Sequence, residues 1–185
     1  MSETTPATQT IVLGGGCFWC LDTVYRQVEG IEKVVAGYAG GHAASPDYWK
    51  VASKKSGHAE VVQVTFSPKV IALADILDIF WAMHDPTTKD QQLYDVGPEY
   101  RSIILYNGPD QKKVIDASLS AAQKLFPKPI VTEVKPLEEF YEAEAEHQNF
   151  YESGRRPDYC QVIINPKLAK LREKFASRLK RKDTA

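Results

Sequence analysis

The sequence predicts an α+β protein, a two-layer sandwich with a ferredoxin-like β-α-β-β-α-β core. Over the first 107 residues, short runs rich in valine and isoleucine alternate with segments of helical apolar spacing, in that order of elements. Of the 185 residues, 43% are hydrophobic and 25% are charged, which is the composition of a globular chain that can bury its own core. We expect a mixed or antiparallel sheet with the helices on one face.

The core elements follow one another in the first half of the chain. The first strand is expected at residues 11–13 and ends in three glycines, after which apolar residues recur at helical spacing from Phe18 to Val28. Gly30 ends that helix. The other expected core elements are strands at residues 31–38, 59–66 and 102–106, and a helix from Leu73 that closes at His84-Asp85-Pro86.

Two polar segments interrupt this core. About twenty residues without obvious structure join the second and third strands, and residues 87–99 also show little periodicity. Unstructured loops of this length are uncommon inside compact domains and are often functional. We therefore expect them to form walls of an active site.

The second half of the chain adds an extension to the core. A helix opens at Pro109, a strand is expected at residues 130–134, and an amphipathic helix carries Leu168 and Leu171. Residues 133–152 hold seven acidic residues against one lysine, and residues 167–182 hold eight basic residues against one glutamate. Such blocks are most simply two solvated faces that attract each other. The chain is predicted to be a single catalytic domain, 1–185, with a flexible start at 1–9 and a C-terminal extension at 135–185.

Charge and targeting signals exclude several functions. A net charge of −1 without a basic stripe argues against a nucleic-acid-binding protein. No apolar run reaches the roughly 18 to 20 residues that a membrane span needs, and the start of the chain lacks the pattern of a secretory signal. We expect a cytoplasmic protein that does not bind membranes, and a monomer by default.

The three cysteines are the most informative residues. An odd number without an export signal favours thiol chemistry or a metal over a disulfide framework. Cys17 begins a predicted helix, where the helix dipole and free backbone N–H groups favour a thiolate, so it is the best candidate nucleophile. Three preceding glycines leave room for another molecule, whereas a buried structural cysteine does not need that room. Cys20 lies one turn further on, close enough for a redox pair, but no second Cys or His pair supports a metal site.

Phe18 and Trp19 separate the two cysteines. Two large aromatic residues beside a nucleophile form an apolar wall that suits a methyl group. Core packing explains one of them more easily than both, because successive helical residues point about 100 degrees apart.

Several separated motifs together resemble one family. They are Gly16-Cys17-Phe18-Trp19, Gly37-Tyr38-Ala39-Gly40-Gly41, Gly57-His58-Ala59-Glu60-Val61-Val62, His84-Asp85-Pro86-Thr87-Thr88 and Tyr100-Arg101-Ser102. From about Thr10 to Cys160 the chain resembles the A-type peptide methionine sulfoxide reductases. The resemblance implies reduction of the S epimer of methionine sulfoxide, free or in proteins, with no metal or organic cofactor.

The resemblance also assigns site residues. The family nucleophile corresponds to Cys17, its methyl pocket to Phe18 and Trp19, and its acidic residue to Glu60. Its two oxygen-binding tyrosines correspond to Tyr48 and Tyr100, and a further carboxylate corresponds to Asp95. The surroundings of Asp95 depart from the family pattern, with Val96, Pro98 and Glu99 where Arg, Thr and Gln are more common.

The chemistry explains these residue types. A sulfoxide sulfur is a weak electrophile until its oxygen is protonated or strongly hydrogen-bonded, so the nucleophile needs an acid. Glu60 lies among apolar residues of a buried strand, where desolvation favours its protonated form. Taken singly, Glu60 could be an edge-strand surface residue and each tyrosine a core aromatic; with a cysteine at the helix start, an acid and two oxygen-binding hydroxyls are the better interpretation.

Attack by Cys17 gives methionine and a sulfenic acid, which a second thiol must reduce. Cys160 matches a C-terminal resolving cysteine of many relatives and lies on a segment that we expect to be flexible. Cys20 is nearer in sequence but must bend the first helical turn to bond Cys17. We expect Cys160 to resolve first, with Cys20 as a direct resolver or a relay, and thioredoxin or a similar dithiol protein as the reductant.

Two other functions stay open on the sequence. One is a thiol-disulfide oxidoreductase built on Cys17 and Cys20. The other is a redox sensor or binding module that signals through Cys160 without turnover. Both predict that Glu60 is dispensable.

Overall fold

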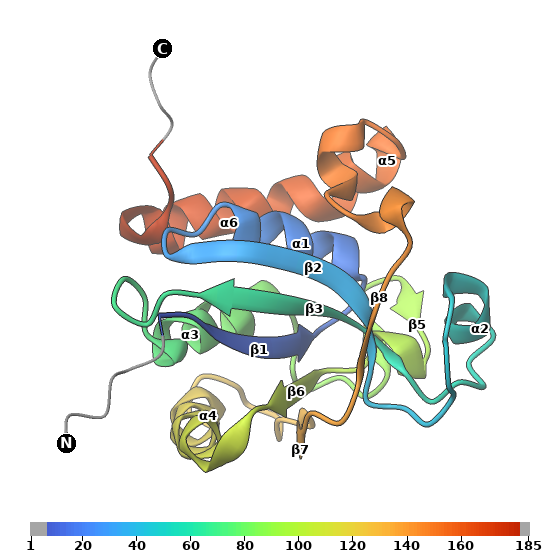
Figure 1. The fold of residues 1–185 in the computed structure, drawn as a ribbon. Coiled ribbons are helices and arrows are strands. Elements are labelled where there is room, and N and C mark those ends of the chain that lie inside the picture. The colour runs from blue at the N-terminus through green and yellow to red at the C-terminus, as the bar shows by residue number, and fades with distance from the viewer. Residues whose placement is uncertain (1–6, 182–185) are drawn as a thin grey trace.

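A six-stranded sheet forms the centre of the structure, a computed structural model that describes residues 7–181 (Figure 1). The flexible start expected at 1–9 falls outside the described residues for 1–6, and the first strand already begins at Gln9. The strand order is β7-β6-β1-β3-β2-β8. The bounds are β1 (Gln9–Gly14), β2 (Ile31–Ala39), β3 (Ala59–Phe66), β6 (Ile103–Tyr106), β7 (Glu133–Pro136) and β8 (Phe140–Glu142).

The four inner strands have the ferredoxin-like arrangement that the sequence predicts. β1 lies antiparallel between β3 and β6, and β2 lies antiparallel to β3. At one edge β7 adds in parallel to β6, and at the other β8 adds antiparallel to β2. The sheet is therefore mixed, and the predicted α+β fold class is confirmed.

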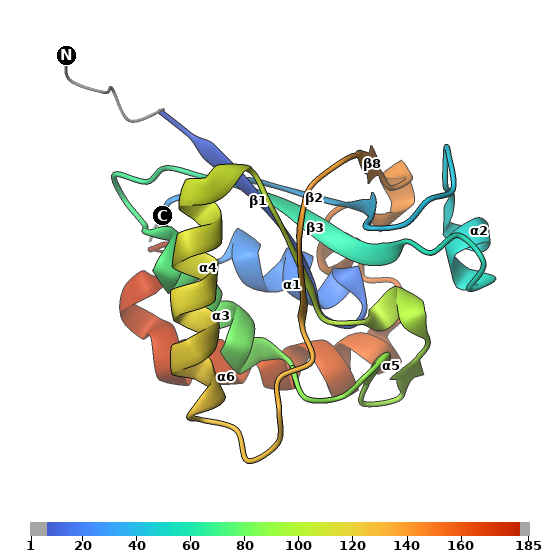
Figure 2. The ribbon, with the colours of Figure 1, turned by 90° about the horizontal axis from the view of Figure 1, so that it is seen from below.

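Four long helices cover one face of this sheet (Figure 2). They are α1 (Phe18–Arg26), α3 (Leu73–Met83), α4 (Gly108–Gln123) and α6 (Asn165–Phe175). α1 packs on β2 and β3, α4 packs on α3, and α6 packs on α1 and α3. Their apolar residues join those of the strands in one buried cluster, to which α1 and α3 contribute most. Leu168 and Leu171 of α6 complete the cluster.

The last fifty residues wrap the sheet. From β7 the chain crosses the face opposite the helices, where Leu137 and Phe140 cover the buried Val61 and Ile103 (Figure 1). A Cβ at Gly37 would lie 2.4 Å from the Phe140 ring, so this crossing fits closely on β2. The chain then returns to the helical face through α5 (Pro157–Tyr159) and α6.

Short elements line the polar segments. They are α2 (Tyr48–Ala52), β4 (Gln91–Gln92), β5 (Asp95–Val96) and the single turns η1 (Pro98–Tyr100), η2 (Ala145–His147), η3 (Phe150–Ser153), η4 (Cys160–Ile164) and η5 (Ala176–Arg178). Elements of two to five residues leave no periodicity to read, and the sequence did not predict them. The strand expected at 130–134 lies slightly later, at β7, where Glu133–Pro136 pair with β6.

The two charge blocks of the C-terminal half do not meet. Within residues 7–181 no ion pair joins the acidic segment to the basic helix, and Arg178 pairs instead with Asp75 of α3 at 2.9 Å. The expected attraction between the blocks is therefore not seen. Of the helices in residues 7–181, none combines the length and the apolar character that crossing a membrane requires.

Candidate active site

Cys17 lies at the junction of β1 and α1, one residue before the first helical residue. Its backbone is extended, with φ −63° and ψ 132°, and the thiol-bearing residue is only 7% exposed. Gly16 has φ +89°, a conformation that L side chains rarely adopt, and so reverses the chain from strand to helix. Cys20 N–H donates to the Cys17 carbonyl at 3.1 Å and closes the first turn.

The glycines before Cys17 meet the protein itself. A Cβ at Gly15 would lie 2.8 Å from the His84 ring. His84 is buried, contacts Phe80 O at 2.6 Å and Ser102 Oγ at 2.7 Å, and burial lowers its pKa to about 3. The expectation that these glycines leave room for another molecule is therefore wrong at Gly15, where a neutral histidine fills that room.

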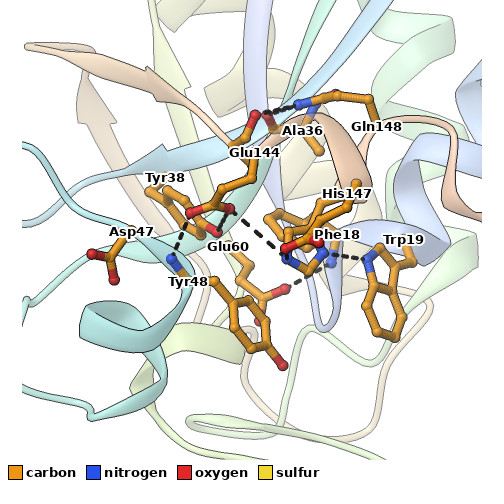
Figure 3. A network of polar contacts seen from close by, with 12 residues as sticks. Phe18, Trp19, Ala36, Tyr38, Asp47, Tyr48, Glu60, Glu144, His147 and Gln148 are labelled. Atoms are coloured by element: carbon orange, nitrogen blue, oxygen red, sulfur yellow. Dashed lines mark hydrogen bonds and ion pairs between the residues drawn. The ribbon is translucent and has the colours of Figure 1, made fainter.

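Glu60 of β3 shares its face of the sheet with the helices. It is 3% exposed, and Phe18 N–H, the first amide of α1, donates to its Oε1 at 3.5 Å (Figure 3). The pKa of Glu60 is raised to about 8: burial is the main cause, the charges of Asp95 and Glu99 add to it, and the hydrogen bond from Phe18 opposes it. The expectation that desolvation keeps this carboxyl protonated near neutral pH is confirmed.

The Cys17 thiol is also protonated at neutral pH. Burial raises its pKa well above the ordinary value, and the neighbouring Glu60 and Cys20 add to the effect. The helix start had favoured a thiolate, and that expectation is wrong at neutral pH. The reason is that burial outweighs the effect of the helix start, and the charge of Glu60, which also accepts from the first helical amide, adds to the shift.

The two polar segments supply the other predicted site residues. Tyr48 begins α2, Asp95 lies in β5, and Tyr100 ends η1. Burial first, then the charges of Glu60 and Cys17, raise the pKa of both tyrosines. Both hydroxyls thus lie in the field of the thiol and the acid, and the expectation that the long segments wall the site agrees with this placement.

The two aromatic residues after Cys17 differ. Phe18 is fully buried, with its ring centroid 5.7 Å from that of Tyr38. Trp19 is half-buried, stacks on Phe150 at 3.8 Å with an interplanar angle of 4°, and meets the edge of Tyr159 at 5.6 Å. Phe18 is therefore a core residue whose amide reaches Glu60, and Trp19 packs in an aromatic cluster with Phe150 and Tyr159.

All three thiols are reduced and buried. The Cys20 sulfur lies 3.7 Å from Tyr159 Oη, and Tyr159 O–H donates to Asp95 Oδ2 at 2.9 Å. Cys160 follows Tyr159 directly, in helical backbone, with its sulfur 3.8 Å from Arg155 O. The segment expected to be flexible is thus helical, and it brings Cys160 next to the residue that touches Cys20.

Sequence reasoning missed four residues beside the site. Glu144, His147, Phe150 and Tyr159 contact Tyr48, Trp19 or Asp95 (Figure 3 shows the first two). The acidic segment was interpreted as a solvated face, yet His147 is buried inside it. A histidine and aromatic residues among the glutamates were the only signal that could have corrected this.

The site pairs a buried thiol with a protonated carboxyl, and Tyr48 and Tyr100 lie in the field of both. This pairing suits a substrate in which the attacked atom carries an oxygen. The thiol attacks that atom while the carboxyl protonates the oxygen. The class that the fold and site define is therefore a cysteine-dependent reductase on an α+β sandwich. Within residues 7–181 no three His, Cys, Asp or Glu side chains are grouped to hold a metal ion.

Comparison with known proteins identifies the family. The family profile described as "Peptide methionine sulfoxide reductase" matches residues 9–179. A curated relative from Paenarthrobacter aurescens, "Peptide methionine sulfoxide reductase MsrA", is 53% identical over 169 residues, which are 91% of this chain and 97% of the relative. The chain belongs to the peptide methionine sulfoxide reductase family.

Solved structures agree with this assignment. Mxr1 from Saccharomyces cerevisiae in reduced form superposes with a TM-score of 0.76 at 32% identity, over 83% of this chain and 90% of the yeast chain. The same yeast protein in complex with Trx2 superposes with a TM-score of 0.56 at 26% identity, over 81% and 89% of the chains.

Proposed function

We propose that this chain is a peptide-methionine (S)-S-oxide reductase that reduces the S epimer of methionine sulfoxide, free or in proteins, to methionine. Family membership supports the reaction class. The observation that carries the mechanism is the Cys17 thiol beside Glu60, a carboxyl with a pKa of about 8.

The proton content of the site matches the reaction. A sulfoxide oxygen needs two protons to leave as water, and at neutral pH Cys17 and Glu60 each hold one. Cys17 sulfur attacks the sulfoxide sulfur, and the oxygen takes one proton from Glu60 and one from the Cys17 thiol. The S–O bond breaks as the S–S bond forms, so that water leaves and a sulfonium bonded to Cys17 sulfur remains beside the Glu60 carboxylate. Water then attacks Cys17 sulfur, releases methionine, and returns one proton to Glu60. In the net reaction, one thiol and one sulfoxide are converted into one sulfenic acid and one thioether.

Three further groups complete the proposal. Tyr48 and Tyr100 bind the sulfoxide oxygen by donating hydrogen bonds to it, in the bound substrate as well as when negative charge develops on it. Phe18 and Trp19 hold the methyl group against apolar surface. Asp95 raises the pKa of Glu60 and accepts from Tyr159, so its proposed role is to keep the acid protonated without touching substrate.

Recycling requires the other two cysteines. A thiol attacks the sulfenic acid of Cys17, which gives a disulfide and water. Both Cys20 and Cys160 are proposed as resolving residues, and the earlier attack by Cys160 stays a prediction. A thioredoxin-type dithiol then reduces the enzyme; the yeast relative solved in complex with Trx2 supports this partner.

Turnover of a chiral methyl sulfoxide with dithiothreitol tests the function. We expect the wild type to consume only the S epimer, and both Cys17→Ser and Glu60→Gln to lose turnover. Activity retained in Glu60→Gln contradicts the acid role. A wild type that reduces a disulfide but no sulfoxide indicates the thiol-disulfide oxidoreductase instead.

Mass mapping after a single turnover tests the resolving order. In Cys20→Ser the expected product is a Cys17–Cys160 disulfide, and its absence shows that Cys20 must act first. Cys160→Ser is the matched variant. A cytoplasmic monomer stays a prediction, and gel filtration tests its oligomeric part.

A further inference from the structure

Glu144 holds two tyrosines at once. Its Oε1 accepts from the Tyr48 backbone N–H at 2.9 Å, and its Oε2 accepts from Tyr38 O–H at 2.8 Å (Figure 3). Tyr48 begins a helix of only five residues, which has little packing of its own because Val51 is its one buried residue. The carboxylate of Glu144 therefore fixes the position of the backbone from which the Tyr48 side chain extends.

His147 contacts both Trp19 and Tyr48. Its Nδ1 accepts from Trp19 Nε1–H at 3.1 Å, and its ring stacks on Tyr48 at 4.7 Å with an interplanar angle of 23°. An indole N–H is a donor only, so Nδ1 carries no proton and the neutral ring holds its proton on Nε2. That nitrogen lies 3.8 Å from Glu144 Oε2. Burial lowers the pKa of His147, which keeps the ring neutral at pH 7.

Trp19 and Tyr48 come from different elements, α1 and α2. His147 contacts both, and Glu144 contacts Tyr48 and faces His147. The distance between a methyl-binding wall and an oxygen-binding hydroxyl decides which sulfoxide can present both groups to one thiol. A pair that fixes both residues therefore sets that distance.

We propose that Glu144 and His147 are positioning residues that hold Trp19 and Tyr48 at the separation a methyl sulfoxide requires. This inference rests on the proposed function for its effect on turnover. The link between His147 and Trp19 can be measured without any substrate.

The first experiment reads the Trp19 indole N–H by NMR in 15N-labelled protein, with Trp19→Phe to assign the signal. Trp49 and Trp81 serve as internal references, because Trp49 is exposed and Trp81 bonds Ser118 at 2.8 Å. His147→Phe keeps an aromatic ring against Tyr48 but removes the acceptor. His147→Asn keeps an acceptor near Nδ1 but removes the ring.

We expect His147→Phe to shift the Trp19 signal and to speed its solvent exchange by about tenfold, as expected for the loss of one hydrogen bond. His147→Asn should restore most of the wild-type exchange rate. An unchanged Trp19 signal in His147→Phe, or exchange in His147→Asn as fast as in His147→Phe, overturns the role of His147.

The second experiment compares two neighbouring carboxylates. Glu144 and Glu146 lie 3.8 Å and 3.9 Å from His147 Nε2, but only Glu144 also bonds Tyr38 and Tyr48. Because an amide supplies one acceptor where the carboxylate supplies two, Glu144→Gln should lower kcat/KM for a methyl sulfoxide by about fivefold or more, mainly through KM. Glu146→Gln should stay within about twofold of wild type, because Glu146 is exposed and its contact with the neutral His147 ring contributes little.

Equal effects of Glu144→Gln and Glu146→Gln, or a fall in kcat alone, overturn the positioning role of Glu144. This pair of variants also decides the proposal if His147→Phe does not fold. A wild type without sulfoxide turnover contradicts the proposed function, whereas the indole measurement still tests the His147–Trp19 link.

Discussion

Two halves of the site are held in different ways. Cys17, Phe18 and Glu60 come from the β1–α1 junction and from β3, and none is more than 7% exposed. Their positions follow from sheet register and helix start, since Glu60 pairs with Tyr38 across β2 and β3 and accepts from the first amide of α1. The groups that exchange bonds and protons are thus fixed by the fold itself.

The other half is supported by individual side chains. Tyr48, Asp95 and Tyr100 lie on short elements and are only partly buried. Glu144 bonds the Tyr48 backbone, and Arg101 bonds the carbonyls of residues 40, 57 and 98 around Tyr100. Substitutions in this half should change substrate binding, whereas substitutions in the first half should change the chemical step. The predictions below test that division.

The largest effect is expected for Glu60→Gln on turnover. The amide is similar in shape but donates a proton poorly, so kcat should fall by about 10²- to 10⁴-fold with little change in KM. In wild type, kcat/KM should fall as the pH rises above about 8, where Glu60 loses its proton. Steady-state kinetics from about pH 6 to about 9.5 measure both effects, because this range covers both sides of the Glu60 titration.

Glu99→Gln is the matched control for this prediction. Glu99 is another buried carboxyl whose charge affects Glu60, and we place it outside the reacting groups. Its substitution should leave kcat within about threefold, as for a charge that acts only from a neighbouring position. A kcat loss in Glu99→Gln as large as that in Glu60→Gln contradicts the assignment of Glu60 as the acid.

The second prediction concerns stability. The pKa of Glu60 is raised from 4.5 to about 8 on folding, so its stabilising contribution is fully present below pH 4.5 and is lost as the pH rises to about 8. Between these values the wild type should lose about 1.4 kcal/mol per pH unit relative to Glu60→Gln, or roughly 3 to 5 kcal/mol in all. Urea unfolding of both proteins across this range measures the difference. Parallel stability profiles would show that Glu60 is not desolvated in the folded protein.

The same division explains what the sequence could and could not predict. A segment rich in valine places Glu60 on a buried strand, and the glycine run before the helical apolar spacing places Cys17 at a helix start, so both positions follow from local sequence patterns. The thiolate expected at Cys17 was wrong because burial, and after it the charge of Glu60, raises the pKa of the thiol, and both depend on tertiary packing.

The second half of the site, which lies on short elements and is called the loop half below, could be assigned only by resemblance to the family. Tyr48 and Tyr100 lie on turns of three to five residues, which carry no periodic signal. Their supports Glu144 and His147 arrive from about one hundred residues away, through a chain that first crosses the opposite face of the sheet. Such contacts depend on tertiary packing, which local patterns do not encode.

The third prediction tests the loop half at Arg101. Arg101→Met keeps the aliphatic stem but removes the donors to three backbone carbonyls, which should cost about 1 to 3 kcal/mol of unfolding free energy and raise KM several-fold. Glu133→Gln keeps those donors and removes the ion pairs of Glu133 with Arg101 at 3.3 Å and with Lys135 at 3.1 Å, which should cost less than about 1 kcal/mol. Urea unfolding and sulfoxide kinetics measure both variants. A fall in kcat at unchanged KM in Arg101→Met breaks the division between binding and chemistry.

The smallest effect is expected for Tyr159→Phe, which lies where the two halves meet. The substitution removes the bond to Asp95 and the contact with Cys20, and should cost about 1 kcal/mol of stability and less than about fivefold in kcat/KM.

The reactivity of the Cys20 thiol measures the loss of the Tyr159 hydroxyl directly. The Tyr159 hydroxyl lowers the pKa of the Cys20 thiol against the stronger effect of burial, so its loss should raise that pKa and slow alkylation of Cys20 at pH 8. Cys17→Ser with Cys160→Ser is the background in which Cys20 is the sole thiol. Tyr151→Phe is the control, because the Tyr151 hydroxyl bonds Asn165 at 2.7 Å instead of a thiol. This variant should leave the alkylation rate unchanged. Faster alkylation in Tyr159→Phe would mean that the tyrosine mainly shields Cys20, and the residue would then belong to the loop half that controls access.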